Sequence, residues 1–176
     1  MNALIKVMAL VCLFTWAAVV RADNAEFGNI NKGNIQADGA ASVSNYAPTG
    51  QTSSFIVVVS PSVQYFVMNR VSIGGSLYFQ HYSSGASWNA LGIGPSATWH
   101  FWSEGHLSAS VSDGLTVNEN TNSRWYLNNS TGLGLNYFIT PSVAIGPALV
   151  VSYQFSSLDL PAALNTSVVV KFSIYF

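Results

Sequence analysis

Two histidines flank a short turn, and their type and spacing make them the first candidates for chemistry. His100 precedes and His106 follows the turn at 103–105, and both lie on the inward face of adjacent predicted strands. Such a diagonal pair could hold a metal ion or activate Ser108 as a nucleophile. The turn residue Glu104 is the one acid in phase beside them, and serine is abundant throughout the chain. We therefore interpret both histidines as structural, and we predict no catalytic residue, no metal site and no cofactor.

Two opposite charges lie on strands that are far apart in the sequence. Asp38 is on the first predicted strand and Lys171 is on the last, and both point to the inward face. If the first and last strands are neighbours in a closed sheet, the two side chains can form an ion pair inside it. The alternative is two separately hydrated charges, and the sequence leaves both open because the stagger of the strands is unknown.

Four aromatic residues recur just before the end of every second predicted strand. They are Phe66, Trp102, Phe138 and Tyr175. The alternation of their strands turns all four rings inward at the same end of the sheet. We therefore expect these four rings to form a constriction at that end.

The elements that position these residues are strands in which apolar and polar side chains alternate. In 53–67 Val and aromatic residues share one face and Ser and Gln share the other, and 71–82, 89–102 and 143–155 repeat the pattern. Short turns near 68–70, 103–105 and 140–142 divide the chain into four hairpins. The predicted strands are 33–46, 53–67, 71–82, 89–102, 106–117, 125–139, 143–155 and 163–176.

The composition indicates the environment of this sheet. The chain is 49% hydrophobic and 7% charged, whereas soluble domains are about 25% charged. After residue 22 no long apolar run exists, because apolar residues alternate with Ser, Gly, Asn and Gln. A sheet with one lipid face and one hydrated face would have this pattern. Basic residues are not clustered, so nucleic acid is not an expected partner.

The two ends of the chain carry signals of their own. Lys6 is followed by an uncharged run and then by Val-Arg-Ala, which is typical of a cleavable signal peptide over 1–22. The run is shorter than the roughly 20 residues that a retained membrane helix needs. At the other end Phe172, Ile174 and Phe176 alternate with polar residues. This ending resembles the signal by which the assembly machinery recognises bacterial outer-membrane barrels.

The segments 60–79, 90–101 and 132–155, together with the terminal strand, resemble the outer-membrane protein β-barrel domain family, the small eight-stranded barrels of the OmpA/OmpX kind. The likeness covers 33–176 and implies an all-β, closed antiparallel transmembrane barrel with short turns on the periplasmic side. We then expect 23–32 to be a short periplasmic segment. We also expect a monomer in the bacterial outer membrane, with lipid and the barrel assembly machinery as its partners.

Two features conflict with simple strand rules. Asp113 falls on the lipid face of its strand, so either it lies above the hydrocarbon or a bulge shifts the phase. Pro61, Pro95 and Pro147 fall inside predicted strands, where each lacks the N–H that a ladder needs. All three project outward, which suggests one shared level with local bulges.

The inward residues are mostly Ser, Gly and Ala, which favours a hydrated cavity or narrow conduit, whereas the four aromatic rings could close it. A membrane-stabilising barrel without transport and a narrow passage for small solutes therefore both remain open. The alternatives are surface recognition through the outer loops, expected at 47–52, 83–88, 118–124 and 156–162, and, less favoured, a barrel hydrolase.

Overall fold

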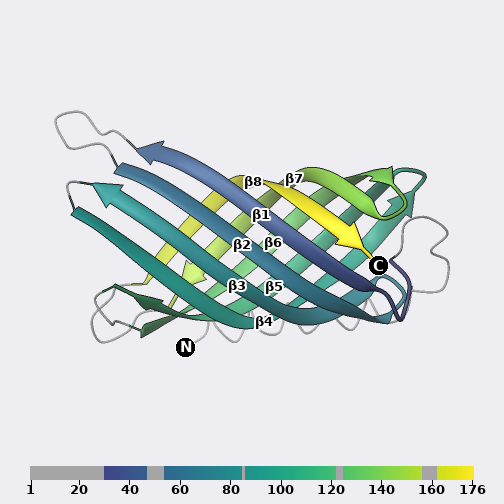
Figure 1. The fold of residues 1–176 in the computed structure, drawn as a ribbon, viewed down its shortest axis with the longest axis horizontal. Helices are drawn as coiled ribbons and strands as arrows, with labels where there is room; N and C mark the ends of the chain where they lie inside the picture. Colours follow the sequence, from purple (N-terminus) through teal and green to yellow (C-terminus); the bar gives the residue numbers. More distant parts are fainter. Residues whose placement is uncertain (1–29, 47–53, 85, 122–124, 156–161) are drawn as a thin grey trace.

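The computed structural model of the chain describes residues 30–46, 54–84, 86–121, 125–155 and 162–176. These residues form one closed antiparallel barrel in which each strand pairs with the next and β1 pairs with β8 (Figure 1). The strands are β1 (Ile35–Tyr46), β2 (Ser54–Met68), β3 (Val71–Ser84), β4 (Ala86–Glu104), β5 (Leu107–Asn120), β6 (Trp125–Thr140), β7 (Val143–Gln154) and β8 (Ala163–Tyr175). The predicted all-β barrel is confirmed. The predicted signal peptide (1–22) and most of the segment 23–32 lie outside the described residues.

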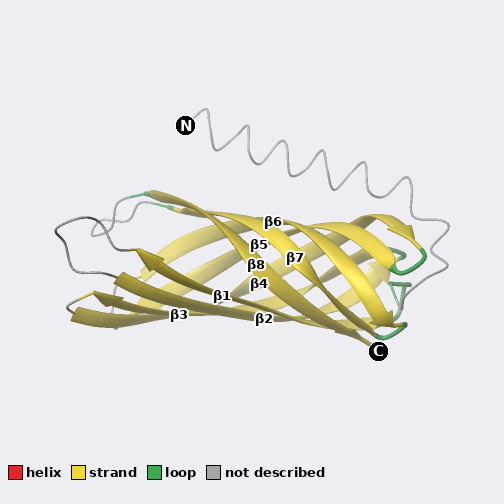
Figure 2. Ribbon diagram, turned by 90° about the horizontal axis from the view of Figure 1, so that it is seen from above, coloured by secondary structure: helices red, strands yellow, loops and turns green. Residues whose placement is uncertain are grey.

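The two ends of the barrel differ. The three short turns and the C-terminus lie at one end, on the right in Figures 1 and 2, and we call it the turn end. The opposite end is the loop end. At the turn end the Ile35 N–H donates to the carbonyl of Phe176 (3.0 Å) and the Phe176 N–H donates back (2.8 Å). The last residue of the chain therefore takes part in closing the barrel.

At the loop end, the predicted loop 83–88 is wrong. β3 and β4 continue as a paired hairpin, with Ser83 opposite Ser87. Tyr82 and Trp88 face each other and stack with ring centroids 5.4 Å apart, and such cross-strand aromatic pairs stabilise a hairpin. Similarly, β5 continues to Asn120, so the connection predicted at 118–124 begins later.

The alternation along each strand separates an inner surface from an outer one. In β6 the residues Tyr126, Asn128, Asn136 and Phe138 are buried, whereas Leu133 between them is 54% exposed. Large apolar side chains are exposed on the outer face of every strand. Among the described residues, no helix is long and apolar enough to span a membrane.

The prolines interrupt pairing without shifting it. Pro61, Pro95 and Pro147 are all exposed on the outer face, and each is in register with one neighbouring strand only. On the other side two pairs are missing, and the register beyond them is unchanged. The bulges expected at the prolines therefore do not form there. Beside Pro95 the two strands approach closely, because a Cβ at Gly94 would overlap the carbonyl of Leu115.

Register shifts occur instead near the turn end, between Phe66 and Met68, between His100 and Trp102, and between Phe138 and Thr140. Each marks an extra residue in an even-numbered strand, and the side chains on its two sides change phase. Consecutive residues then face outward: Phe101 is 41% and Trp102 39% exposed. These bulges decide which aromatic rings enter the lumen.

Candidate functional site: the lumen and its floor

The turn end of the lumen is closed by a packed cluster, which we call the floor. It consists of Ile30, Phe66, His100, Phe138 and Tyr175, each with 0–1% of its surface exposed. Phe138 packs on Tyr175 with ring centroids 5.3 Å apart, and His100 lies 5.9 Å from Phe66 and 6.2 Å from Tyr175. The five side chains are inaccessible to solvent and close this end of the lumen.

The structure changes one member of the predicted constriction. Phe66, Phe138 and Tyr175 point into the lumen, but Trp102 is on the outer face and His100 takes the place predicted for it. The bulge between His100 and Trp102 is the cause, because it reverses the phase of the strand before its end. The alternation through Ser96, Thr98 and His100 continues to Trp102 in the sequence, so the local pattern did not reveal the bulge.

The four ring residues share one backbone arrangement. Each ring residue donates its backbone N–H to the carbonyl of the residue just before the neighbouring odd-numbered strand. The donors are Phe66, His100, Phe138 and Tyr175. Their acceptors are the carbonyls of Asn34 (2.9 Å), Arg70 (2.8 Å), His106 (2.7 Å) and Ser142 (2.8 Å), respectively. The barrel wall thus presents one ring residue from each even-numbered strand at the same place.

The fifth member of the floor comes from outside the barrel wall. The Ile30 side chain is fully buried, and the Ile30 carbonyl accepts a hydrogen bond from the Arg70 N–H (2.8 Å). The Lys32 N–H donates to the Asn69 side chain at 3.0 Å, and the Gly33 N–H donates to the Phe66 carbonyl at 2.9 Å. Sequence reasoning missed Ile30, because nothing local distinguishes one apolar residue in a segment assigned to the periplasm.

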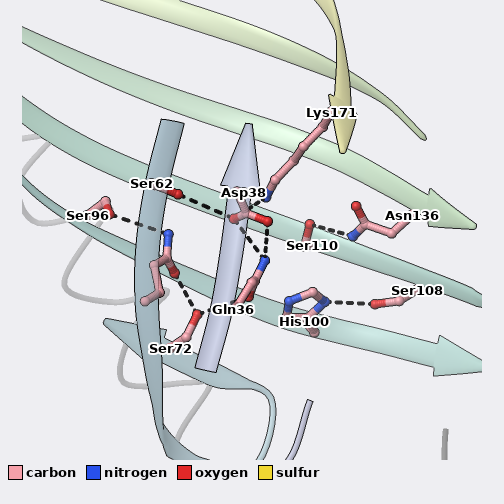
Figure 3. Close-up of polar contacts among 11 residues, drawn as sticks. Gln36, Asp38, Ser62, Ser72, Ser96, His100, Ser108, Ser110, Asn136 and Lys171 are labelled. Carbon is pink, nitrogen blue, oxygen red and sulfur yellow. Dashed lines mark hydrogen bonds and ion pairs between the residues drawn. The ribbon is translucent and has the colours of Figure 1, made fainter. Parts of the chain in front are cut away.

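Above the floor a polar network runs along the inner wall from β8 through β1 to β2 (Figure 3). Lys171 Nζ lies 3.0 Å from Asp38 Oδ2, and both side chains are buried. The Gln36 amide donates to both oxygens of Asp38 at 2.8 and 2.9 Å. The Ser62 hydroxyl lies 3.5 Å from the same carboxylate. The structure thus brings together the two charges singled out in the sequence and surrounds them with donors.

The histidines are separated by the wall of the barrel. His100 is inside, with Nδ1 2.9 Å from the Ser108 hydroxyl, whereas His106 is outside and stacks on Tyr137 at 5.9 Å. His106 Nδ1 donates to the carbonyl of Phe138 at 2.9 Å. Both His100 and Ser108 are completely buried. This histidine and serine therefore join β4 to β5 and do not present a nucleophile to solvent.

The loop-end part of the lumen is hollow. A cavity of about 490 Å³ extends from Asp38 and Lys171 up to Tyr126 and Gln154 near the ends of their strands. Most of its wall is Ser, Thr, Asn, Gln, Gly and Ala, which are too small to meet across the barrel. The described residues contain no group of three His, Cys, Asp or Glu side chains that could hold a metal ion.

Asp113 lies on the outer face, as its strand phase predicted, and no bulge interrupts β5 beside it. Its carboxylate accepts hydrogen bonds from the Thr131 hydroxyl (2.7 Å) and from the Asn129 amide (3.2 and 3.4 Å). Both donors belong to the adjacent strand β6, and the three side chains form a small polar patch.

Comparison with known proteins gives a structural match without a sequence match. The sequence matches no protein-family model, and no curated protein matches it. The structure is similar to neisserial surface protein A (NspA), with a TM-score of 0.56 at 15% identity over 81% of this chain and 96% of that one. The N-terminal β-barrel domain of OprF from Pseudomonas aeruginosa gives a TM-score of 0.53 at 17% identity, covering 82% and 98%. OprG from the same organism gives 0.50 at 9% identity, covering 85% and 99%.

The chain therefore has the fold of the small eight-stranded outer-membrane β-barrels, as the sequence resemblance predicted.

Proposed function

We propose that this chain is an integral outer-membrane barrel that strengthens the membrane and does not conduct in its resting state. Residues 1–22 would be the signal peptide that exports it, the turn end would face the periplasm, and the mature barrel would be a monomer. Support for insertion comes from the outer face, where Val63, Leu91, Ile93 and Val170 are at least 60% exposed. Exposed apolar surface of this extent fits a lipid solvent.

The floor is the observation that supports a non-conducting resting state. Five fully buried side chains fill the turn end, and the Asp38–Lys171 pair lies directly above them. A solute in the cavity would have to displace both layers to leave through that end. The cavity itself favours a second candidate, passage of small solutes, which would require the floor to move.

Localisation is tested by membrane fractionation together with gel mobility before and after boiling. We expect the chain in the outer membrane and a faster band before boiling, because a closed barrel stays compact in detergent. The boiled and unboiled halves of one sample serve as each other's control. Recovery from the soluble periplasmic fraction would contradict insertion.

Conductance in planar bilayers tests the closed floor. We expect small or no steps from the native barrel and larger steps when Phe66→Ala and Phe138→Ala are combined, because these changes remove two of the buried rings. Trp102→Ala is the matched control, since this ring lies outside the lumen and should leave conductance unchanged. Large steps from the native barrel would contradict the resting state that we propose.

The proposed assembly signal is tested separately from export. Phe176→Asp should impair insertion while leaving the cleavage of 1–22 intact, because the change affects the terminal strand and its closing contact with Ile35. Cleaved but uninserted protein, measured by fractionation, is the expected result. Normal insertion of this variant would show that Phe176 is not required by the assembly machinery.

A further inference from the structure

The seam between β1 and β8 is paired along only part of its length. Pairing runs from Gln36 opposite Tyr175 to Ala41 opposite Val170 and then stops. Both strands continue toward the loop end, where β1 stays paired with β2 as far as Tyr46 and β8 with β7 as far as Ala163. Figures 1 and 2 show the two strands diverging toward the loop end. Within the described residues, 42–46 and 163–169 thus form facing strand edges that are not paired with each other.

These edges lie where the outer face is apolar. Val43 is 66% and Val168 71% exposed, and Leu149, opposite Val168 on β7, also faces outward. In hydrocarbon a backbone N–H or C=O without a hydrogen-bond partner is strongly unfavourable. An opening at this depth therefore requires an occupant that satisfies polar groups on one side and tolerates lipid on the other.

The opening is continuous with the lumen cavity. The cavity is lined from β1 by Ala41, Ser42 and Val43, and from β8 by Asn165, Thr166, Ser167 and Val168. Ala41, Val43 and Val168 belong to the outward phase of their strands, and both unpaired edges of the seam thus form part of the cavity wall. The route thus has an apolar rim and a polar interior.

The interior favours an uncharged head group. Asp38 and Lys171 neutralise each other at the bottom of the cavity. The walls above them carry hydroxyl and amide groups, including those of Tyr78, Tyr126, Asn128 and Ser152. Hydroxyl and amide groups of this kind can donate to and accept from a hydroxyl-rich head group.

We propose that the unpaired part of the seam is a binding site for a single-chain amphiphile with an uncharged, hydroxyl-rich head group. The head group occupies the lumen cavity, and the chain passes between β1 and β8 into the bilayer. Hydroxyl groups of the ligand supply the partners that the backbone edges lack. The proposal rests on the membrane insertion proposed above.

Photolabelling in phosphatidylcholine vesicles tests the site. The mature chain is refolded from urea into vesicles without detergent, and the probe is an alkyl glucoside with a diazirine on its chain. We expect mass spectrometry to find labelling concentrated on β1 and β8 and suppressed by excess unlabelled alkyl glucoside. A diazirine-labelled alkane without the sugar is the control, and it should label the outer face evenly. The unboiled gel band of the same sample reports insertion, so failure to insert is distinguished from failure to bind.

Joining the two edges gives a second measurement. The sequence has no cysteine after Cys12, so Val43→Cys with Val168→Cys can be joined by a bismaleimide. Ala37→Cys with Ile174→Cys, opposite each other in the paired part of the seam, is the matched control. Joining the first pair should abolish most of the glucoside labelling, and joining the control pair should leave it unchanged.

Disulfide formation between the two cysteines, without a linker, tests the separation of the two strand edges directly. A disulfide requires Cα atoms within about 7 Å. The pair at 43 and 168 should therefore oxidise more slowly than the control pair. Equal oxidation rates, labelling that is even and cannot be saturated, or labelling that survives joining would each overturn the proposal.

Discussion

The two halves of the barrel are built from the same strands, but they differ in the side chains that those strands direct into the lumen. Near the turns, four rings, Ile30 and the Asp38–Lys171 pair fill the lumen, and the seam is fully paired. Toward the loops the lumen is hollow, with a wall of mostly small and short polar residues beside Tyr78 and Tyr126, and the seam is unpaired. Asp38 belongs to β1 and Lys171 to β8, so the buried ion pair bridges the seam near the point where pairing stops.

In this barrel the paired part of the seam coincides with the filled part of the lumen. Backbone pairing between β1 and β8 extends over the half that the ring cluster and the Asp38–Lys171 pair occupy. Beyond Ala41 and Val170 the inward positions include Ser42 on β1 and Val169, Ser167 and Asn165 on β8, which are shorter than the rings and the lysine of the packed half. The predictions below alter the packed half or the barrel wall, and each is compared with a control substitution.

Removing the bridge should have the largest effect. Lys171→Ala leaves Asp38 as a buried charge without a cation, and breaking a buried pair in this way costs about 3–5 kcal/mol. Asp38→Asn with Lys171→Met should cost less than Lys171→Ala, because no charge remains buried. Urea unfolding in vesicles of Asp38→Asn, Lys171→Met and their combination gives the coupling energy by a double-mutant cycle. The exposed Lys32→Ala is the control, and a coupling near zero would mean that the two charges are separately solvated.

Removing a floor ring should come next. Phe138→Ala deletes a fully buried ring that packs on Tyr175, and we expect a loss of about 3 kcal/mol in the free energy of unfolding. Ile139→Ala is the matched control, since this neighbour is 56% exposed on the outer face. Equal losses in the two variants, measured by urea unfolding, would show that the floor is not a packed core.

A methyl group in the wall should cost less. Gly94→Ala places a Cβ against the Leu115 carbonyl, and the strands must shift to accept it, at about 1–3 kcal/mol. Gly75→Ala is the control, because its Cβ would meet the Gly94 carbonyl at an ordinary 3.8 Å. Unfolding in urea should separate the two variants, and identical stabilities would contradict the close approach beside Pro95.

The smallest effect is expected where one ring replaces another. His100→Phe gives β4 the residue that β2 and β6 have at the same place, and it loses the contact with Ser108, which is worth about 1 kcal/mol. Repacking of the larger ring should offset part of that loss. Trp102→Ala, on the outer face, should leave the floor intact. If Trp102→Ala lowered the free energy of unfolding more than Phe138→Ala, this would support the sequence-based prediction that Trp102 lies inside the lumen.

Much of the fold could be predicted because strand alternation is local. The alternation within a run such as 143–155 is enough to identify its two faces. The predicted bounds of most strands differ from the observed ones by only a few residues. The same information placed Asp113 on the outer face and turned Phe66, Phe138 and Tyr175 inward. These properties depend only on the period of the strand.

What the sequence could not predict depends on partners in other strands. A bulge adds one residue against a neighbouring strand, so the exchange of Trp102 for His100 is decided by register and not by local pattern. Ile30 became part of the floor because Arg70 and Asn69 hold its segment. The meeting of Asp38 with Lys171 and the point where the seam opens both follow from the stagger between β1 and β8. The sequence by itself determined the strands and their faces, whereas only the closed tertiary structure decided which inward residues meet, because closure sets the stagger.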